Sequence, residues 1–392
     1  METSLHTPTD TALRSLDTPR DHVTQRAYRS ALLWTWRRLY FGSVTVAGRV
    51  PAQPGALYLS THRNGGIDGA IASHAAGSSP VPVAASQITR SLWGRWTGCI
   101  EVVRSTDRER HGHAKGVREP LADALARLAA GESLLWFPEG TSDGGPTLLP
   151  VKHGAARLLA QAVEQGIGVR VLVIGLHYQQ MDALQSDVEV DVAEPQELQP
   201  LALAIVSGDV RPAEIQLRIE CALRAATIEY PDARVQGDIE TLTARLGLPV
   251  VASRRAMLRL PPSIVHAGAV RAQAASSALP LRAVLWFLPW SAAATAWLPT
   301  LAVAYALTRR ADRNNKAFIR SLVAMPLIPL NLALSSWLLA MAGLRWPFAM
   351  LAVVVLLPLG LIAHRQLRRA RSQTRAMRTL RDEFAAHGVK VQ

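Results

Sequence analysis

The residues best suited to chemistry are His62 and Asp68, six positions apart in the sequence Thr-His-Arg-Asn-Gly-Gly-Ile-Asp. The apolar run 55–60 just before them is typical of a short buried strand. Two glycines between the pair allow the chain to fold back. A carboxylate that holds one imidazole nitrogen protonated leaves the other free to accept a proton near pH 7. The pair therefore supplies two members of a catalytic triad, and a substrate would bring the hydroxyl.

Two more polar clusters follow apolar runs. Arg104 ends the run 99–104, and the sequence Pro-Glu-Gly-Thr-Ser at 138–142 follows the run 133–137. Ligands of open α/β sheets bind beyond the carboxyl ends of the strands. We therefore expect all three clusters to face one crevice.

Segments typical of strands and helices alternate between residues 40 and 230. This alternation predicts an α/β fold with a mostly parallel sheet flanked by helices. Helices are expected to begin near Ile67, to span 114–130 and to open within 148–156. Strands are expected at 43–47, 55–60, 81–86, 99–104, 133–137, 169–176 and 188–192.

Composition narrows the classes of partner. The chain has 392 residues and a formal net charge of +13, which indicates an anionic partner such as lipid headgroups or nucleic acid. Much of this charge flanks apolar segments, where membrane topology already accounts for it, so nucleic acid is not expected. The two cysteines, Cys99 and Cys221, are too few and too scattered for a disulfide framework or a zinc site.

The chain divides into five predicted regions. Residues 1–22 are polar, lack a secretory signal and are expected to be disordered. A large domain over 23–246 begins with a basic amphipathic helix at 23–41, which could lie on a membrane surface or pack on the protein's own core. A proline-containing, loop-rich linker follows at 247–282, then membrane segments at 283–363 and a basic tail at 364–392.

Three uncharged apolar runs, 283–308, 321–344 and 346–363, are candidates for membrane-spanning helices. The arginine-rich segments after the first run and after the third should remain in the cytoplasm, so the last two runs form a hairpin. Pro289 and Pro299 interrupt the first run, which favours a re-entrant or surface-lying pair of half-helices. The prediction is a multi-pass protein of the cytoplasmic (inner) membrane, with its large domain facing the cytoplasm.

Four motifs in order resemble the glycerophospholipid and lysophospholipid acyltransferase superfamily. They are H-R-N-G-G-I-D at 62–68, I-E-V-V-R at 100–104, F-P-E-G-T-S at 137–142 and L-P-V-K-H-G at 149–154. The usual pattern has four residues between the histidine and the aspartate, whereas this chain has five. A branch that resembles the yeast-type glycerol-3-phosphate acyltransferases carries this longer spacing. The resemblance covers residues 40 to about 195 and implies a glycerolphosphate acyltransferase-like fold.

The resemblance implies a role for each motif. His62 would be the general base on an acceptor hydroxyl, and Asp68 would orient the imidazole. Arg104 would bind the acceptor phosphate, with Lys152 as a second cation. Glu139 would fix a glycerol hydroxyl or order the cationic groups. The remaining substrate-binding residues are expected to be Arg63, Asn64, Gly140 and Thr141.

The activity implied is the transfer of a fatty acyl group to glycerol-3-phosphate or a lysophospholipid, as in phospholipid biosynthesis. Acyl-CoA or an acyl carrier protein would be the co-substrate, and neither a cofactor nor a metal is expected. A metal centre of His62, Asp68, His153 and His177 would lack the one-face helical spacing of zinc proteases. The alternative is a non-catalytic lipid-binding membrane protein that retains the fold, which the unusual His-Asp spacing favours.

Overall fold

The computed structural model describes residues 24–390, apart from positions between 25 and 36 and the ranges 49–53, 86–97, 103–119, 208–210 and 276–282. The predicted disorder of residues 1–22 and the predicted site residue Arg104 lie outside the described residues. The described positions from 24 to 40 are helical, with Trp34 exposed and Tyr40 buried in the domain core. The position of this helix on a membrane surface or on the protein's own core stays a prediction.

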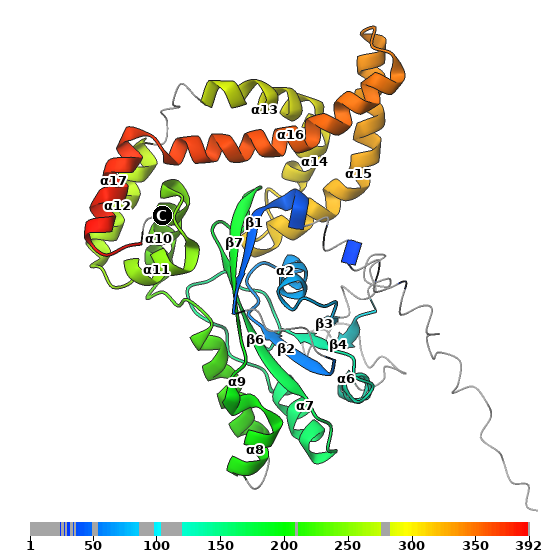
Figure 1. Cartoon of the computed structure of the whole chain (residues 1–392), viewed down its shortest axis with the longest axis vertical. Coiled ribbons are helices and arrows are strands. Elements are labelled where there is room, and N and C mark those ends of the chain that lie inside the picture. The colour runs from blue at the N-terminus through cyan, green and yellow to red at the C-terminus, as the bar shows by residue number, and fades with distance from the viewer. Residues whose placement is uncertain are drawn as a thin grey trace, which may run out of the picture.

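Seven strands form one sheet in the order β1-β7-β6-β2-β5-β3-β4 (Figure 1). Neighbouring strands are parallel except for β6 and β7, which form an antiparallel hairpin. The central strand β2 is buried along its whole length, so its sequence is almost continuously apolar, whereas β7 alternates. The strands span Phe41–Ala47 (β1), Ala56–Ser60 (β2), Val81–Ala85 (β3), Ile100–Val102 (β4), Leu134–Trp136 (β5), Arg170–Tyr178 (β6) and Ser186–Ala193 (β7).

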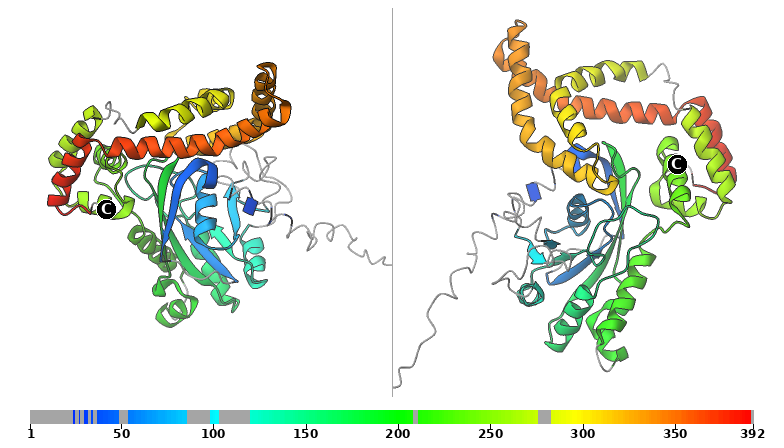
Figure 2. Two further views of the ribbon diagram at one scale, coloured as in Figure 1. Left: turned by 45° about the horizontal axis from the view of Figure 1, so that its top comes forward. Right: turned by 180° about the vertical axis from the view of Figure 1, so that it is seen from behind.

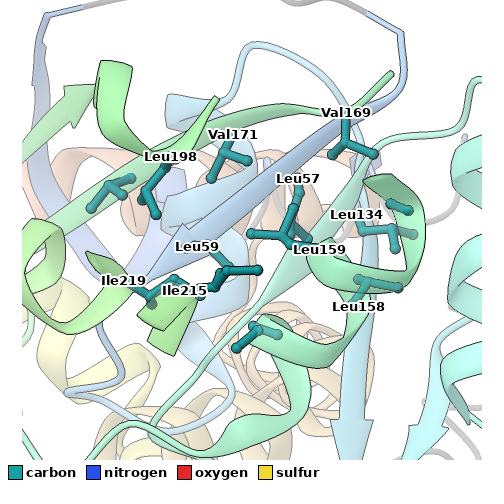
Figure 3. Packing of buried hydrophobic residues seen from close by; sticks show 14 of the residues in the cluster. Leu57, Leu59, Leu134, Leu158, Leu159, Val169, Val171, Leu198, Ile215 and Ile219 are labelled. Atoms are coloured by element: carbon teal, nitrogen blue, oxygen red, sulfur yellow. The ribbon is translucent and has the colours of Figure 1, made fainter. Parts of the chain in front are cut away.

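Helices cover both faces of this sheet. One apolar cluster joins β2, β5 and β6 to α6 (Pro120–Ala129), α7 (His153–Glu164) and α9 (Pro212–Ala225), and Figure 3 shows its centre. A second cluster joins the opposite face to α2 (Ile67–Ala75). The predicted α/β class, a mostly parallel sheet flanked by helices, is therefore confirmed.

The prediction that residues 247–282 form a loop-rich linker is wrong. Two helices occupy most of it, α11 (Val250–Met257) and α12 (Pro262–Ala274). Pro249 and Pro261 precede these helices, where a missing backbone N–H costs nothing, so the prolines mark helix starts rather than loops. Together with α10 (Ala233–Leu246) they enclose a separate apolar cluster. The short helix α8 spans Pro200–Ser207, and a 3-10 turn spans Gln196–Leu198.

The apolar runs form four helices beside this domain, and Figure 2 shows them from two sides. Helices α15 (Arg313–Met341) and α16 (Trp346–Ser372) are long and apolar enough to cross a membrane. Helices α13 (Val284–Ala296) and α14 (Leu298–Leu307) are bent by 73° at their junction, as a broken span or a re-entrant loop would be. The last helix, α17 (Arg375–Ala386), packs its apolar side on α10 and α12.

Candidate functional site

The turn after β2 brings the predicted pair together. The strand ends at Ser60, and α2 begins at Ile67 with Asp68 in its first turn. His62 Nδ1 lies 2.8 Å from Asp68 Oδ2. Gly65 adopts a φ of +56°, a left-handed conformation that lets five intervening residues close the same contact. The extra residue in the motif is therefore accommodated within the turn.

Three donors hold the Asp68 carboxylate. Besides the imidazole, the backbone N–H of Asn64 donates to Oδ2 at 2.7 Å, and the Tyr178 hydroxyl donates to Oδ1 at 2.5 Å. Burial and the adjacent carboxylate raise the pKa of Tyr178 well above its usual value, so the phenol remains a donor. Tyr178 comes from the end of β6 and was not among the predicted site residues. In the sequence Tyr178 lies two residues beyond the strand expected at 169–176, at the end of the run G-L-H-Y at 175–178, which also resembles the yeast-type branch.

The imidazole of His62 is positioned by ring stacking as well as by its hydrogen bond to Asp68. The ring stacks on Phe137 with centroids 4.3 Å apart and planes 25° apart. Within the described residues nothing hydrogen-bonds to Nε2, and the side chain is 14% exposed. This arrangement leaves one basic nitrogen available to an incoming hydroxyl.

The buried carboxylate of Glu139 connects two of the motifs through hydrogen bonds and does not face the surface. Its Oε1 accepts the backbone N–H of His62 at 2.7 Å, and its Oε2 accepts that of Leu149 at 3.1 Å. Burial raises its pKa, while these N–H groups and the charge of Arg63 act in the opposite direction. Direct contact with a glycerol hydroxyl does not fit a residue that is 1% exposed with both oxygens occupied. We therefore reassign Glu139 as a positioning residue.

The remaining residues of this corner lie at the surface. Gly140 has a φ of +73°, and a Cβ there would lie 3.4 Å from Lys152 Cγ. Lys152 caps the N-terminus of α7, and its backbone N–H donates to Pro138 O at 2.8 Å. Both Lys152 and Thr141 are exposed. A cation at a helix N-terminus, beside a hydroxyl, suits an anionic group.

Arg63 and Asn64 were predicted to bind substrate, and the structure uses both inside the protein. Arg63 Nη1 donates to the carbonyls of Gly145 and Thr147 at 2.9 and 3.2 Å. Asn64 Nδ2 donates to Met181 O at 2.8 Å. Both side chains are buried, because the turn directs them inward toward these two loops. They fasten the turn to its neighbours, and the substrate-binding assignment is corrected.

The start of α15 lies directly on the His62 turn. A Cβ added to Gly66 would be 2.6 Å from the Phe318 ring, and one added to Gly65 would be 2.6 Å from Asn315 Oδ1. Glycine is therefore required at both positions by a helix from the apolar region. This close packing places α15, one of the two helices long enough to cross a membrane, against the candidate site.

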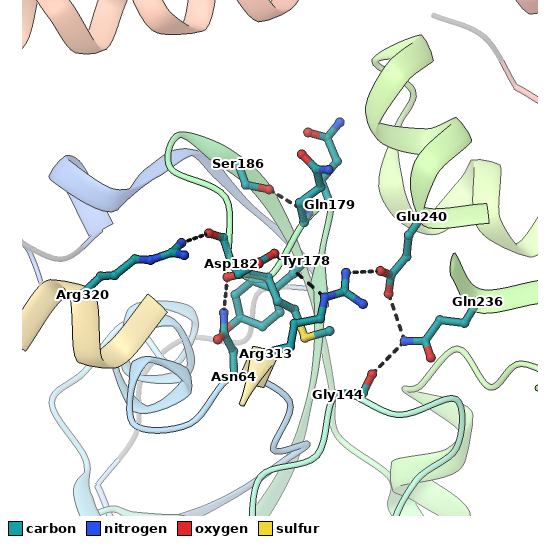
Figure 4. Close-up of polar contacts among 12 residues, drawn as sticks. Asn64, Gly144, Tyr178, Gln179, Asp182, Ser186, Gln236, Glu240, Arg313 and Arg320 are labelled. Carbon is teal, nitrogen blue, oxygen red and sulfur yellow. Dashed lines mark hydrogen bonds and ion pairs between the residues drawn. The ribbon is translucent and has the colours of Figure 1, made fainter. Parts of the chain in front are cut away.

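Polar contacts secure the same helix end (Figure 4). Arg313 pairs with the buried carboxylate of Glu240, and Arg320 Nη1 donates to Asp182 O. Asn314 Nδ2 donates to Ser142 O at 2.7 Å, next to the exposed corner. Part of the basic segment expected to set membrane orientation thus also docks α15 on the α/β domain.

The histidines considered for a metal centre are not brought together with the pair. His177 lies 3.5 Å from Asp191 of β7, and His153 opens α7. Across the part of the chain that the structure describes, no group of three or more His, Cys, Asp or Glu side chains could hold a metal ion. Of these four residues, His62 and Asp68 are the two that the structure brings into hydrogen-bond contact.

Comparisons with known proteins give one family match and one solved structure to report. Residues 43–185 match the family model described as Acyltransferase. Among solved structures, the 1-acyl-sn-glycerophosphate (LPA) acyltransferase PlsC from Thermotoga maritima matches with 16% identity and a TM-score of 0.37, over 54% of this chain and 82% of that one. Comparison with curated proteins gives no match. The match to the Acyltransferase family model covers residues 43–185, the part of the chain that carries all four ordered motifs.

Proposed function

We propose that this protein is a membrane-bound O-acyltransferase of phospholipid biosynthesis. It would move a fatty acyl group from acyl-CoA or an acyl carrier protein to a hydroxyl of glycerol-3-phosphate or a lysophospholipid. The observation that carries the proposal is the 2.8 Å contact between His62 Nδ1 and Asp68 Oδ2, with Nε2 left without a partner in the described residues.

The proposed reaction needs no nucleophile from the protein. Asp68 accepts a hydrogen bond from the Nδ1–H of His62, which keeps the proton on Nδ1 and the free lone pair on Nε2. Nε2 takes the proton of the acceptor hydroxyl while that oxygen attacks the thioester carbonyl carbon. The carbon–sulfur bond then breaks, and the imidazolium returns its proton to the departing thiolate. The products are an ester and a free thiol, and the histidine ends neutral.

The acceptor's phosphate would bind at the exposed corner that contains Thr141 and Lys152. Lys152, at the N-terminus of α7, and the neighbouring Thr141 would hold it through a charge-assisted hydrogen bond and a hydroxyl. Arg104 remains a proposed phosphate ligand, because it lies outside the described residues. Glu139 would keep the His62 turn and the Lys152 loop at a constant separation through its two backbone contacts.

A direct assay tests the reaction. Purified protein is supplied with labelled acyl-CoA or acyl carrier protein and with either glycerol-3-phosphate or lysophosphatidate, and the lipid product is quantified. Replacing His62→Ala should lower the rate roughly 100- to 10,000-fold, the usual contribution of a general base. Asp68→Asn is the companion variant, because it keeps the shape and removes the charge. Equal product from wild type and His62→Ala would favour the non-catalytic lipid-binding alternative.

We also propose that α15 and α16 cross the inner membrane as a hairpin, with the α/β domain in the cytoplasm and α13–α14 re-entrant. The arginines at the domain end of this hairpin support that orientation. Single cysteines at the exposed positions Glu197 and Thr379, in a variant without native cysteines, should react with an impermeant thiol reagent from the same side. A cysteine at Leu344, in the hairpin turn, should react from the other side. Labelling of Glu197 and Thr379 from opposite sides would overturn this topology.

A further inference from the structure

A large cavity lies away from the His62 site. It has a volume of about 550 Å³, within the range of roughly 300–1,000 Å³ for ligand pockets. Helices α13, α14, α15 and α16 form most of its wall, and the loop between β6 and β7 forms another part. None of His62, Glu139 and Lys152 lines it. The cavity is therefore separate from the proposed acyl-transfer chemistry.

The cavity wall is amphipathic in a particular way. Much of it is apolar, from side chains that include Trp290, Leu301, Ile328, Leu357 and Leu361. Among the described residues, the charged members of the lining are all cationic when ionised, since it includes four arginines and a histidine and no aspartate or glutamate. The cationic members are Arg245, Arg320, Arg368, Arg371 and His364. Such a wall matches a molecule with an apolar chain and an anionic end.

Two of these arginines are used by the protein and two are not. Arg320 donates to Asp182 O, and Arg368 donates to Leu184 O and to the side chain of Gln179. In the described part of the chain, the exposed guanidiniums of Arg245 and Arg371 have neither an ion pair nor a hydrogen bond. These two arginines supply positive charge that an external anion can use.

The junction of α13 and α14 and the first turn of α14 add polar groups that lack partners in the described residues. Trp297 and Thr300 both line the cavity, and they are only 6% and 5% exposed. The indole Nε1 of Trp297 and the hydroxyl of Thr300 are buried without a hydrogen-bond partner. Leaving a buried donor without an acceptor is unfavourable, so such groups are normally satisfied. Ester oxygens of a bound lipid would satisfy them.

We propose that this cavity binds an anionic phospholipid at a site distinct from the catalytic one. The phosphate lies at Arg245 and Arg371, an acyl chain lies against the apolar wall, and ester oxygens meet Trp297 and Thr300. The exposed apolar faces of the surrounding helices, including Leu285 and Leu288 of α13, place the cavity where bilayer lipid can reach it.

Native mass spectrometry of the full chain tests the proposal. The protein is released from nanodiscs that contain equal amounts of phosphatidylglycerol and phosphatidylcholine, and the retained lipid is identified. Wild type should retain one phosphatidylglycerol in preference to phosphatidylcholine. The double variant Arg245→Gln, Arg371→Gln should lower that preference about thirtyfold, as expected for the loss of two arginines near an anionic headgroup.

Matched variants separate the site from general charge and from general packing. Arg369→Gln with Arg375→Gln removes the same charge from exposed positions outside the cavity and should leave the preference unchanged. Ala324→Trp fills the cavity without changing charge and should prevent retention, whereas Leu330→Trp, on an exposed face of the same helix, should not. Inorganic phosphate added at millimolar concentration should not displace the lipid, because it lacks the chain.

Each unfavourable outcome has a definite meaning. Equal retention by wild type and the Arg245, Arg371 variant, or equal loss in the two double variants, would overturn the proposal. Retention by Ala324→Trp at the wild-type level, or displacement by inorganic phosphate alone, would also overturn it. His62→Ala should retain phosphatidylglycerol as wild type does, so failure of the proposed acyl transfer leaves this binding test intact.

Discussion

Tyr178→Phe is the sharpest test of how the site is positioned. The substitution removes one oxygen, and with it the only donor to Asp68 Oδ1 among the described residues. The side chain is buried at the end of β6, so the phenylalanine ring can occupy the same space. Substrate cannot reach this hydroxyl, and any effect on catalysis must therefore act through the carboxylate and the imidazole.

The structure sets the expected size of the effect. A hydrogen bond to a charged group contributes about 1.5–3 kcal/mol. If the bond is needed in full when His62 carries the proton, kcat should fall roughly 10- to 150-fold. KM should change little, because Tyr178 does not touch the acceptor or the thioester. The free energy of unfolding should fall by about 1–3 kcal/mol, since one carboxylate oxygen stays buried without a partner.

The assay is steady-state acyl transfer with both acceptors, alongside thermal unfolding. Tyr58→Phe is the matched control, because it makes the same chemical change at a buried tyrosine whose hydroxyl meets Ala76 O at 3.4 Å and not Asp68. We expect this control to keep nearly wild-type kcat. A kcat for Tyr178→Phe that equals wild type, or that equals the Tyr58→Phe value, would refute the assignment of Tyr178 as a positioning residue.

Three further predictions follow from single contacts. Glu139→Gln places an amide donor against a backbone N–H, so it should lower the free energy of unfolding by about 1–3 kcal/mol and remove most of kcat. Because burial raises the pKa of Glu139 in the folded protein, its ionisation disfavours folding, and the stability difference between wild type and variant should narrow as the pH rises through that pKa. Chemical denaturation that shows this difference widening from pH 4 to 7 would contradict the prediction. Gly66→Ala drives a methyl group into the Phe318 ring, so it should lower the free energy of unfolding by about 1–3 kcal/mol and reduce acyl transfer. The control Gly69→Ala, whose added methyl would have nothing within 4 Å, should be neutral or stabilising by up to about 1 kcal/mol. Equal melting temperatures for the two variants would count against the packing of α15 on the turn. Arg313→Gln removes the cation from a buried carboxylate and should destabilise the protein by about 1–3 kcal/mol, while Arg310→Gln, at an exposed position, should change stability by less than about 0.5 kcal/mol.

Local sequence patterns were sufficient to predict the fold class and the pairing of His62 with Asp68. The burial of β2 on both faces is recorded in its own composition, and the glycines of the next turn permit the fold-back that joins His62 to Asp68. The breaks in the apolar run at Pro289 and Pro299 likewise indicated the bent pair α13–α14, whose topology stays a proposal. These features depend on residues close together in the sequence, so the sequence pattern carries them.

Distant contacts decided the rest. The Tyr178 hydroxyl contacts Asp68 although the two residues are 110 positions apart in the sequence, and no periodicity near either residue predicts that contact. Arg63 and Asn64 have the residue types of a substrate site, yet the loops around them turn both inward. The linker prolines looked like loop formers, because a proline is compatible both with a loop and with the first turn of a helix. The sequence by itself thus determined the order of the motifs and the helices and strands around them. Only the tertiary structure decided which side chains face the reaction, because that choice depends on elements packed from remote parts of the chain.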